Sequence, residues 1–231
     1  MSEDDLPRAH REPDGDPNTR LLALSDGVIA VAITLLVLDI RLPEAFGQWS
    51  DAQLWGALVA LWPRFLAYLL SFFVIGNLWN SHRAKFDAIV KSDGGLVWIN
   101  MLFLLTIGLL PFTTNLIAES GGTLTTAVYA ASMVVSGLAL VWLWAHARRN
   151  GLVDKTVTAE DSRRQYSSVI VMVSVFAISI PLSIAHADLA KYFWILIVPA
   201  NFVARLLAVQ RWKRGHPGET IRKRFGTGKG K

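Results

Sequence analysis

Long stretches without charged residues dominate the pattern of hydrophobic and polar positions along this chain. Five stretches contain no Asp, Glu, Lys or Arg, and a sixth contains only Asp26. A helix that rises about 1.5 Å per residue needs about 20 apolar residues to cross a hydrocarbon core of about 30 Å. The pattern therefore predicts an all-α integral membrane protein with six transmembrane helices per subunit. The stretches are 21–38, 65–82, 94–118, 120–147, 165–187 and 192–204, and the last reaches the required length only by continuing past Arg205 to Val209.

Basic residues are distributed unevenly between the two sides of this predicted bundle. They collect before residue 21, in the connections 83–93 and 148–164, and after residue 210, whereas the other loops contain few. Because basic loops stay on the cytoplasmic side, the asymmetry predicts a multi-pass protein of the cell (plasma) membrane with both termini cytoplasmic. The opposite side is acidic and carries Asp39, Glu44, Asp51, Glu119 and Asp188.

Composition divides the chain into three regions. Residues 1–18 are acidic and contain several prolines, which predicts a disordered cytoplasmic tail. Residues 19–210 make up the six-helix transmembrane domain, and residues 211–231 form a basic cytoplasmic tail that we expect to contact anionic lipids. The net charge of +5 does not indicate a nucleic-acid partner, because the basic residues flank the membrane spans and no nucleic-acid-binding fold accompanies them.

Signatures of catalysis and of cofactor binding are missing from the sequence. The chain has no cysteine, which excludes disulfides, thiolate metal sites and thiol catalysis. It also has no GxSxG elbow, Walker loop, GxGxxG turn or HExxH pair. The potassium-filter sequence TVGYG is absent as well. We therefore expect neither an enzyme nor a bound cofactor.

The 21–38 stretch is the only predicted span with an ionisable residue well inside it, Asp26. Two interpretations of Asp26 remain open: a carboxylate paired for structural reasons, or a carrier of protons or ions. Helical spacing also defines two overlapping faces. One is a stripe of small residues that permits close helix packing, Ala23, Gly27, Ala30 and Thr34. The other is a mixed face with one hydroxyl, Gly27, Val31, Thr34 and Leu38.

Four polar residues are predicted to lie at the same depth, near the cytoplasmic side of the membrane. They are Arg20, Asp26, His82 and Asn100. Polar groups inside a membrane must be satisfied by one another, so we expect one hydrogen-bonded cluster. A metal site is less favoured, because one His with an Asn and an Asp is a weak ligand set.

A specific resemblance emerges around Asp26. The string Arg20-Leu-Leu-Ala-Leu24-Ser25-Asp26 resembles the RxxxFSD signature of the transmembrane protein 175 family, with Leu24 where the family usually has Phe. The resemblance covers the first three predicted spans. It continues through the segment 63–72, Trp79-x-x-His82, Asn100 and Leu110-Pro111-Phe112-x-Thr114.

This resemblance implies a potassium channel built as a homotetramer, with the first span of each six-helix subunit lining a central pore. The family's pore positions correspond to Val31, Thr34 and Leu38. Rings of Val31 and Leu38 would be hydrophobic constrictions. A potassium ion passing close to the Thr34 hydroxyls would exchange part of its hydration shell for them. We therefore expect modest selectivity for potassium over other monovalent cations.

The resemblance also implies that a polar network anchors the first span. Its members would be Arg20, Ser25, Asp26, His82 and Asn100. Two alternatives remain open at this point, a proton-coupled secondary transporter that uses Asp26 and a membrane scaffold without a pore. No internal repeat is visible in the sequence, which counts against the transporter.

Overall fold

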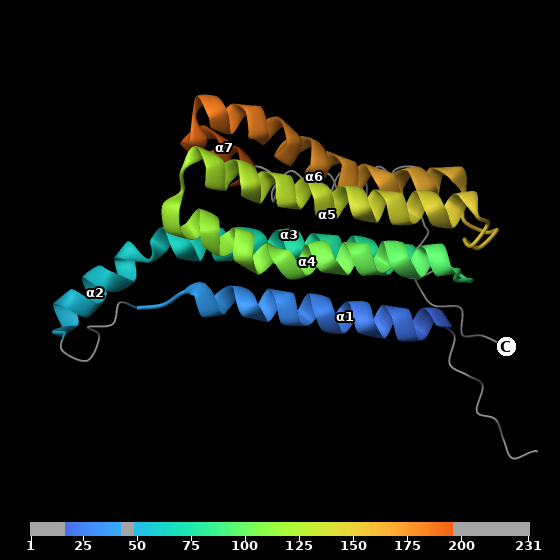
Figure 1. Cartoon of the computed structure of the whole chain (residues 1–231), viewed down its shortest axis with the longest axis horizontal. Coiled ribbons are helices and arrows are strands. Elements are labelled where there is room, and N and C mark those ends of the chain that lie inside the picture. The colour runs from blue at the N-terminus through green and yellow to red at the C-terminus, as the bar shows by residue number, and fades with distance from the viewer. Residues whose placement is uncertain (1–16, 43–48, 196–231) are drawn as a thin grey trace, which may run out of the picture.

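The computed structural model describes residues 17–42 and 49–195, and these residues are helical apart from their loops and a single β-bridge between Ile89 and Val153. The long helices lie side by side along one axis, and α2 projects from one end of the bundle (Figure 1). The elements are α1 (Pro17–Leu35), η2 (Leu36–Asp39), α2 (Asp51–Ala60), α3 (Trp62–Phe86), α4 (Gly94–Ser120), α5 (Thr123–Arg149), α6 (Ala159–Ala185) and α7 (Ala187–Ile195).

Among the described residues, three helical segments are long and apolar enough to cross a membrane by themselves. They are Asn18–Asp39, Gly94–Ser120 and Thr123–Arg149. A fourth span is α2 with α3, if the 45° bend between them is counted as a break within one span. In α6 the apolar part is shorter, Val169–Ala185. In its described residues the chain is therefore all-helical, with several helices suited to cross a membrane, as in a multi-pass membrane protein.

Six spans per subunit stay a prediction. Each of the first five apolar stretches falls almost entirely within a long helix, and the sixth begins in α7, which is described only as far as Ile195. The remainder of that stretch lies outside the described residues, as do nearly all of the predicted acidic tail and the whole basic tail. Their predicted roles, including lipid contact by residues 211–231, are untested.

Short polar signals set the helix boundaries. Ser50 and Gln53 form a capping box at the start of α2, in which each side chain bonds the other residue's backbone N–H. An Asp93 oxygen accepts the Leu96 N–H at 2.7 Å and caps α4. Gly121 ends α4 in the left-handed conformation, with φ of 55°, which a residue with a side chain adopts only with strain.

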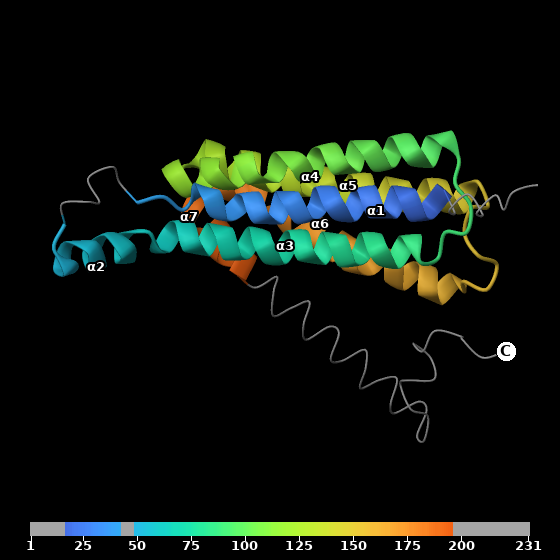
Figure 2. The same ribbon diagram turned by 90° about the horizontal axis from the view of Figure 1, so that it is seen from below.

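The apolar core runs between the layers of the bundle. Helix α5 lies between α4 and α6, while α1 lies between α3 and α4 on the outside of the bundle (Figures 1 and 2). Tyr129, Phe176 and Trp194 form an aromatic cluster that joins α5, α6 and α7, with ring centroids 5.0 to 6.0 Å apart. Other buried members of the core are Ile29, Leu36, Ile75, Leu78, Phe103, Ile107 and Leu140.

Candidate functional site

Helix α1 has one buried face and one exposed face. Ile29 and Ala32 are 1% and 2% exposed and pack toward α3 and α4, whereas Val31 and Leu38 are 56% and 57% exposed. Thr34 is also exposed on that second face. Figure 2, seen from the side of α1, shows no described element in front of this helix. The structure thus brings the three predicted pore residues onto one uncovered face of a membrane-length helix.

The Thr34 hydroxyl has a defined orientation. Its Oγ1 donates a hydrogen bond to the Val31 carbonyl oxygen, one turn earlier in α1, at 2.8 Å. A hydroxyl has one proton and two lone pairs, so donation to the backbone leaves the oxygen free to accept. The exposed face of α1 therefore presents an oxygen ligand between two apolar side chains.

Behind α1, three buried polar residues form a hydrogen-bonded chain. The Asn100 amide nitrogen donates to Ser25 Oγ at 3.0 Å, and the Asn100 oxygen lies 2.8 Å from Nε2 of His82. Because that amide oxygen can only accept, Nε2 of His82 carries the proton. The His82 ring is stacked between Phe86 and Phe103, with centroids 4.5 and 5.2 Å away. Ser25, Asn100 and His82 thus fasten α1, α4 and α3 together.

Asp26 has a different partner. Nε1 of Trp79 donates to Asp26 Oδ1 at 2.7 Å, and the Arg83 guanidinium lies 5.9 Å from the centroid of the Trp79 ring. Arg20 is exposed and lies outside this group of hydrogen bonds within one chain. The predicted five-residue network therefore stays a prediction. Within the described chain, Ser25, His82 and Asn100 form one unit and Asp26 is held separately by Trp79.

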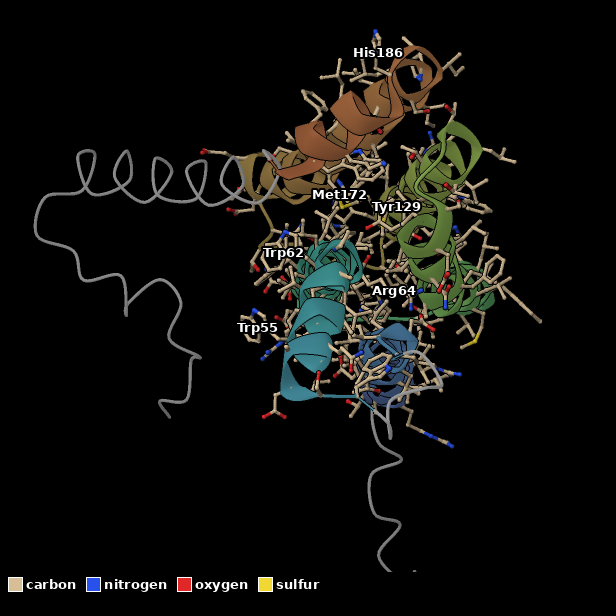
Figure 3. The ribbon with its side chains drawn as sticks, turned by 90° about the vertical axis from the view of Figure 1, so that its left-hand side faces the viewer. Trp55, Trp62, Arg64, Tyr129, Met172 and His186 are labelled. Atoms are coloured by element: carbon tan, nitrogen blue, oxygen red, sulfur yellow. The ribbon has the colours of Figure 1, made fainter. Side chains whose placement is uncertain are left out.

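The other end of α1, near α2, is held by further polar contacts. Nδ2 of Asn115 in α4 donates to Asp39 Oδ1 at 2.8 Å, and Nε of Arg41 donates to the Leu38 carbonyl oxygen at 3.0 Å. Nearby, an ion pair of 2.9 Å joins Arg64 of α3 to Glu119 of α4. Figure 3 shows Arg64 on the α4 side of α3, and Trp55 and Trp62 on the other side.

No set of three His, Cys, Asp or Glu side chains in residues 17–42 and 49–195 is placed to hold a metal ion. The described polar groups instead serve to join helices, and the exposed face of α1 carries apolar and hydroxyl groups.

These features define a helical membrane protein in which one span, α1, has an uncovered face with apolar and hydroxyl side chains. Comparisons with known proteins agree with the class of helical membrane proteins. The sequence model of the family described as "Endosomal/lysosomal potassium channel TMEM175" matches residues 20–111. A potassium channel of Streptomyces collinus is 37% identical over 194 residues, which cover 78% of this chain and 93% of that protein. The chain belongs to the TMEM175 family, as the resemblance around Asp26 predicted.

Two further relatives bear on the site. The crystal structure of a lysosomal potassium-selective channel TMEM175 homolog from Chamaesiphon minutus superposes with a TM-score of 0.70 and 26% identity, covering 81% of this chain and 97% of that one. The human endosomal/lysosomal proton channel TMEM175 is 36% identical over 120 residues, which cover 44% of this chain and 24% of that protein.

The sequence alone did not reveal two of the contacts. Trp79 entered the sequence analysis only through its spacing from His82 in the family resemblance, which gives no sign of its bond to Asp26. The bond between Asn115 and Asp39 had no local signal, because these residues are 76 positions apart. The available hint was an amide well inside a helix of predominantly apolar residues, where a polar partner is required.

Proposed function

We propose that this chain is the subunit of a cation channel that conducts potassium with modest selectivity. The observation that carries the proposal is the exposed face of α1, on which Val31, Thr34 and Leu38 follow one another along a membrane-length helix. Membership of the family supports it, because relatives at 31% and 37% identity are potassium channels. Potassium and other monovalent cations are the partners that this function implies.

Several copies are needed, because one helix cannot enclose a path for ions. Closed rotational symmetry converts a single exposed residue into a ring, and a homotetramer of six-helix subunits places four copies of α1 around one axis. In this arrangement the buried face of each α1 stays against its own α3 and α4. Both termini are cytoplasmic and the assembly lies in the plasma membrane, with α2 on the outer side.

The chemistry of the path follows from the side chains. Rings of Val31 and Leu38 form apolar constrictions, which resist wetting when they are narrow. Thr34 supplies a hydroxyl oxygen whose proton is already committed to the Val31 carbonyl. Neutral oxygen ligands favour the less strongly hydrated potassium ion over sodium only weakly, which is why the proposed selectivity is modest.

The network behind α1 would keep this face in register. Ser25, Asn100 and His82 are completely buried and link three helices, and Trp79 fixes Asp26 beside them. Arg20 remains a proposed fifth member. In this proposal the network carries no ions, and its role is to hold α1 at a fixed rotation and depth.

Thr34→Val tests the proposal directly. The change keeps the shape of the side chain but removes the oxygen, so the potassium-to-sodium permeability ratio should fall when purified protein is assayed in liposomes. Thr123→Val, at the exposed start of α5, is the matched control and should leave the ratio unchanged. An unaltered ratio in Thr34→Val would remove Thr34 from the selective part of the path. Absence of any potassium flux from the wild-type protein would favour a scaffold without a pore.

A second candidate function is a proton-coupled transporter that uses Asp26. The observation in its favour is that Asp26 is only half-buried and, among the described residues, accepts a hydrogen bond from Trp79 at Oδ1. Asp26→Asn keeps an oxygen for Trp79 but removes the titratable carboxylate. A transporter would lose uptake driven by a pH gradient in this variant, whereas a channel would still pass potassium down its own gradient at equal pH on both sides.

A further inference from the structure

The end of α1 near α2 differs in geometry from the rest of the helix. Residues Leu36–Asp39 form the 3-10 turn η2, in which three residues make one turn. Asp39 therefore lies directly above the buried Leu36, on the side that faces α4. The bond from Asn115 to Asp39 Oδ1 agrees with this placement, and Asp39 remains partly exposed. A carboxylate is thus fixed immediately after Leu38, beside the proposed path for ions.

An opposite charge is fixed at the same place. Nε of Arg41 donates to the Leu38 carbonyl oxygen at 3.0 Å, and the Arg41 side chain is exposed. This bond caps a carbonyl at the C-terminal end of η2, where a cation is favourable. The result is one negative and one positive group within three residues after Leu38, which forms the proposed outer constriction.

Other charges at this end of the described chain are placed differently. Glu119 is paired with Arg64, so its charge is largely compensated. Asp51 lies in the first turn of α2, which projects away from the bundle (Figure 1). Lys191 of α7 lies close to Gly121, where α4 ends. Among the described residues, Asp39 and Arg41 are the charges that the chain itself carries at this end of α1.

We propose that Asp39 and Arg41 set the rate at which cations reach the pore from its α2 end, through opposing electrostatic effects, and that Asn115 is a positioning residue for Asp39. This inference rests on the proposed function, because it requires the exposed faces of several α1 helices to surround a path. Repetition by symmetry turns each group into a ring of charge. Rings of one sign change the local cation concentration and therefore the conductance.

Single-channel conductance at low and high ionic strength tests the inference. In about 10 mM KCl the Debye length is about 30 Å, so the charges of Asp39 and Arg41 act across the whole α2 end of the proposed pore. In 1 M KCl the Debye length is about 3 Å, so these charges are screened. Asp39→Asn leaves an oxygen for Asn115 and leaves Arg41 uncompensated, so conductance for cations coming from the α2 end should fall about two-fold or more at low salt. Arg41→Gln should raise it. Both differences should vanish in 1 M KCl.

Asn115→Leu and a matched control separate position from charge. Asn115→Leu keeps the carboxylate but frees it from α4, so it should change conductance at low salt less than Asp39→Asn does. It should have no further effect in the Asp39→Asn background. Asp51→Asn removes an acidic charge on the same side but away from α1, and should leave the conductance unchanged.

The outcomes distinguish this inference from the proposed function. If the wild-type protein passes no potassium, the proposed function fails. If the wild-type protein conducts, and Asp39→Asn and Arg41→Gln both match it at every salt concentration, the channel stands and the inference is wrong. An equal effect of Asp51→Asn would also overturn it, because a diffuse surface charge would then explain the result.

Discussion

Helices α1 and α5 have similar apolar composition but very different surroundings. In the most apolar 18-residue segment of each span, 28% of the residues are buried in the α1 span compared with 44% in α5. The exposed residues also differ in kind. Along its central part, α5 exposes large side chains such as Val135, Leu138 and Trp142, which suit contact with lipid. In the α1 span, exposed large side chains such as Val31 and Leu38 are interspersed with exposed Gly27 and Thr34, whose small and hydroxyl groups suit close contact between helices or a path for ions. Burial alone does not distinguish these two roles, whereas the composition of the uncovered face does.

The largest expected effect comes from breaking the contacts that hold α1 from behind. Asn100→Leu removes the N–H donated to Ser25 and the oxygen that accepts from His82. Ser25 keeps its bond to the Leu21 carbonyl oxygen, whereas the buried Nε2–H of His82 is left unsatisfied at a cost of about 1–3 kcal/mol. We expect a large fall in the thermal unfolding temperature of the protein in detergent. Leu105→Ala, on the exposed face of the same helix, is the control and should have a small effect. Equal stability of Asn100→Leu and the wild type would show that the hydrogen-bonded chain does not fasten α1.

A pair of glycines sharpens the comparison between the two helices. A Cβ at Gly137 of α5 would collide with Val173 Cγ2 and come within 3.1 Å of Met172 Cε, both in α6, whereas a Cβ at Gly27 of α1 would meet nothing within 4 Å in the described chain. Gly137→Ala should therefore destabilise the fold by about 1–3 kcal/mol, as overpacking usually does. Gly27→Ala should leave the folding of the single chain intact.

The measurement for this pair is thermal unfolding combined with the size of the assembly in detergent. If the small face of α1 packs against other copies of the chain, Gly27→Ala should disturb assembly without unfolding the subunit. A loss of subunit stability in Gly27→Ala comparable to that in Gly137→Ala would contradict the view that this face is uncovered within one chain.

The sequence predicted the features of this fold that depend on local pattern. Apolar runs predicted the long helices, and helical spacing grouped Val31, Thr34 and Leu38 on one face before any contact was known. Four polar residues at one depth predicted a cluster, and two of them, His82 and Asn100, do bond each other. Each of these predictions depends either on the helical period of 3.6 residues or on the number of residues needed to cross the membrane, and both can be counted in the sequence.

Contacts between helices that are far apart in the sequence could not be predicted, because they depend on the rotation of each helix about its axis and on the direction of its side chains. Asp26 and Trp79 are 53 positions apart, and only the packing of α1 against α3 brings the indole nitrogen to the carboxylate. The expected cluster of Asp26 with Arg20 stays a prediction, since Arg20 lies on an exposed part of α1 within one chain. The depth of a residue in the membrane can be predicted from the sequence, whereas the rotation of its helix about the helix axis depends on how the neighbouring helices pack against it.

The smallest expected effect concerns the C-terminal end of α5, where His146 lies 2.9 Å from the carboxylate of Asp93. The Leu96 N–H bond, and after it the bond to His146, lowers the pKa of Asp93 below its ordinary value. A lowered folded-state pKa means that the ionised group stabilises the fold above the unfolded pKa. This stabilisation is fully present above the unfolded pKa of about 4 and is lost progressively as the pH falls from there through the lower folded-state pKa.

Thermal unfolding between pH 6 and pH 3 checks this effect. Asp93→Asn can still cap α4 but cannot titrate, so its unfolding temperature should fall less on acidification than that of the wild type. Because both partners are partly exposed, the ion pair contributes at most about 1 kcal/mol, and the difference should be small. His146→Gln keeps the Leu96 bond, which is the larger cause of the lowered pKa, and should therefore retain most of the acid sensitivity. If Asp93→Asn loses stability with acid as steeply as the wild type, this carboxylate does not secure the α4–α5 end of the bundle.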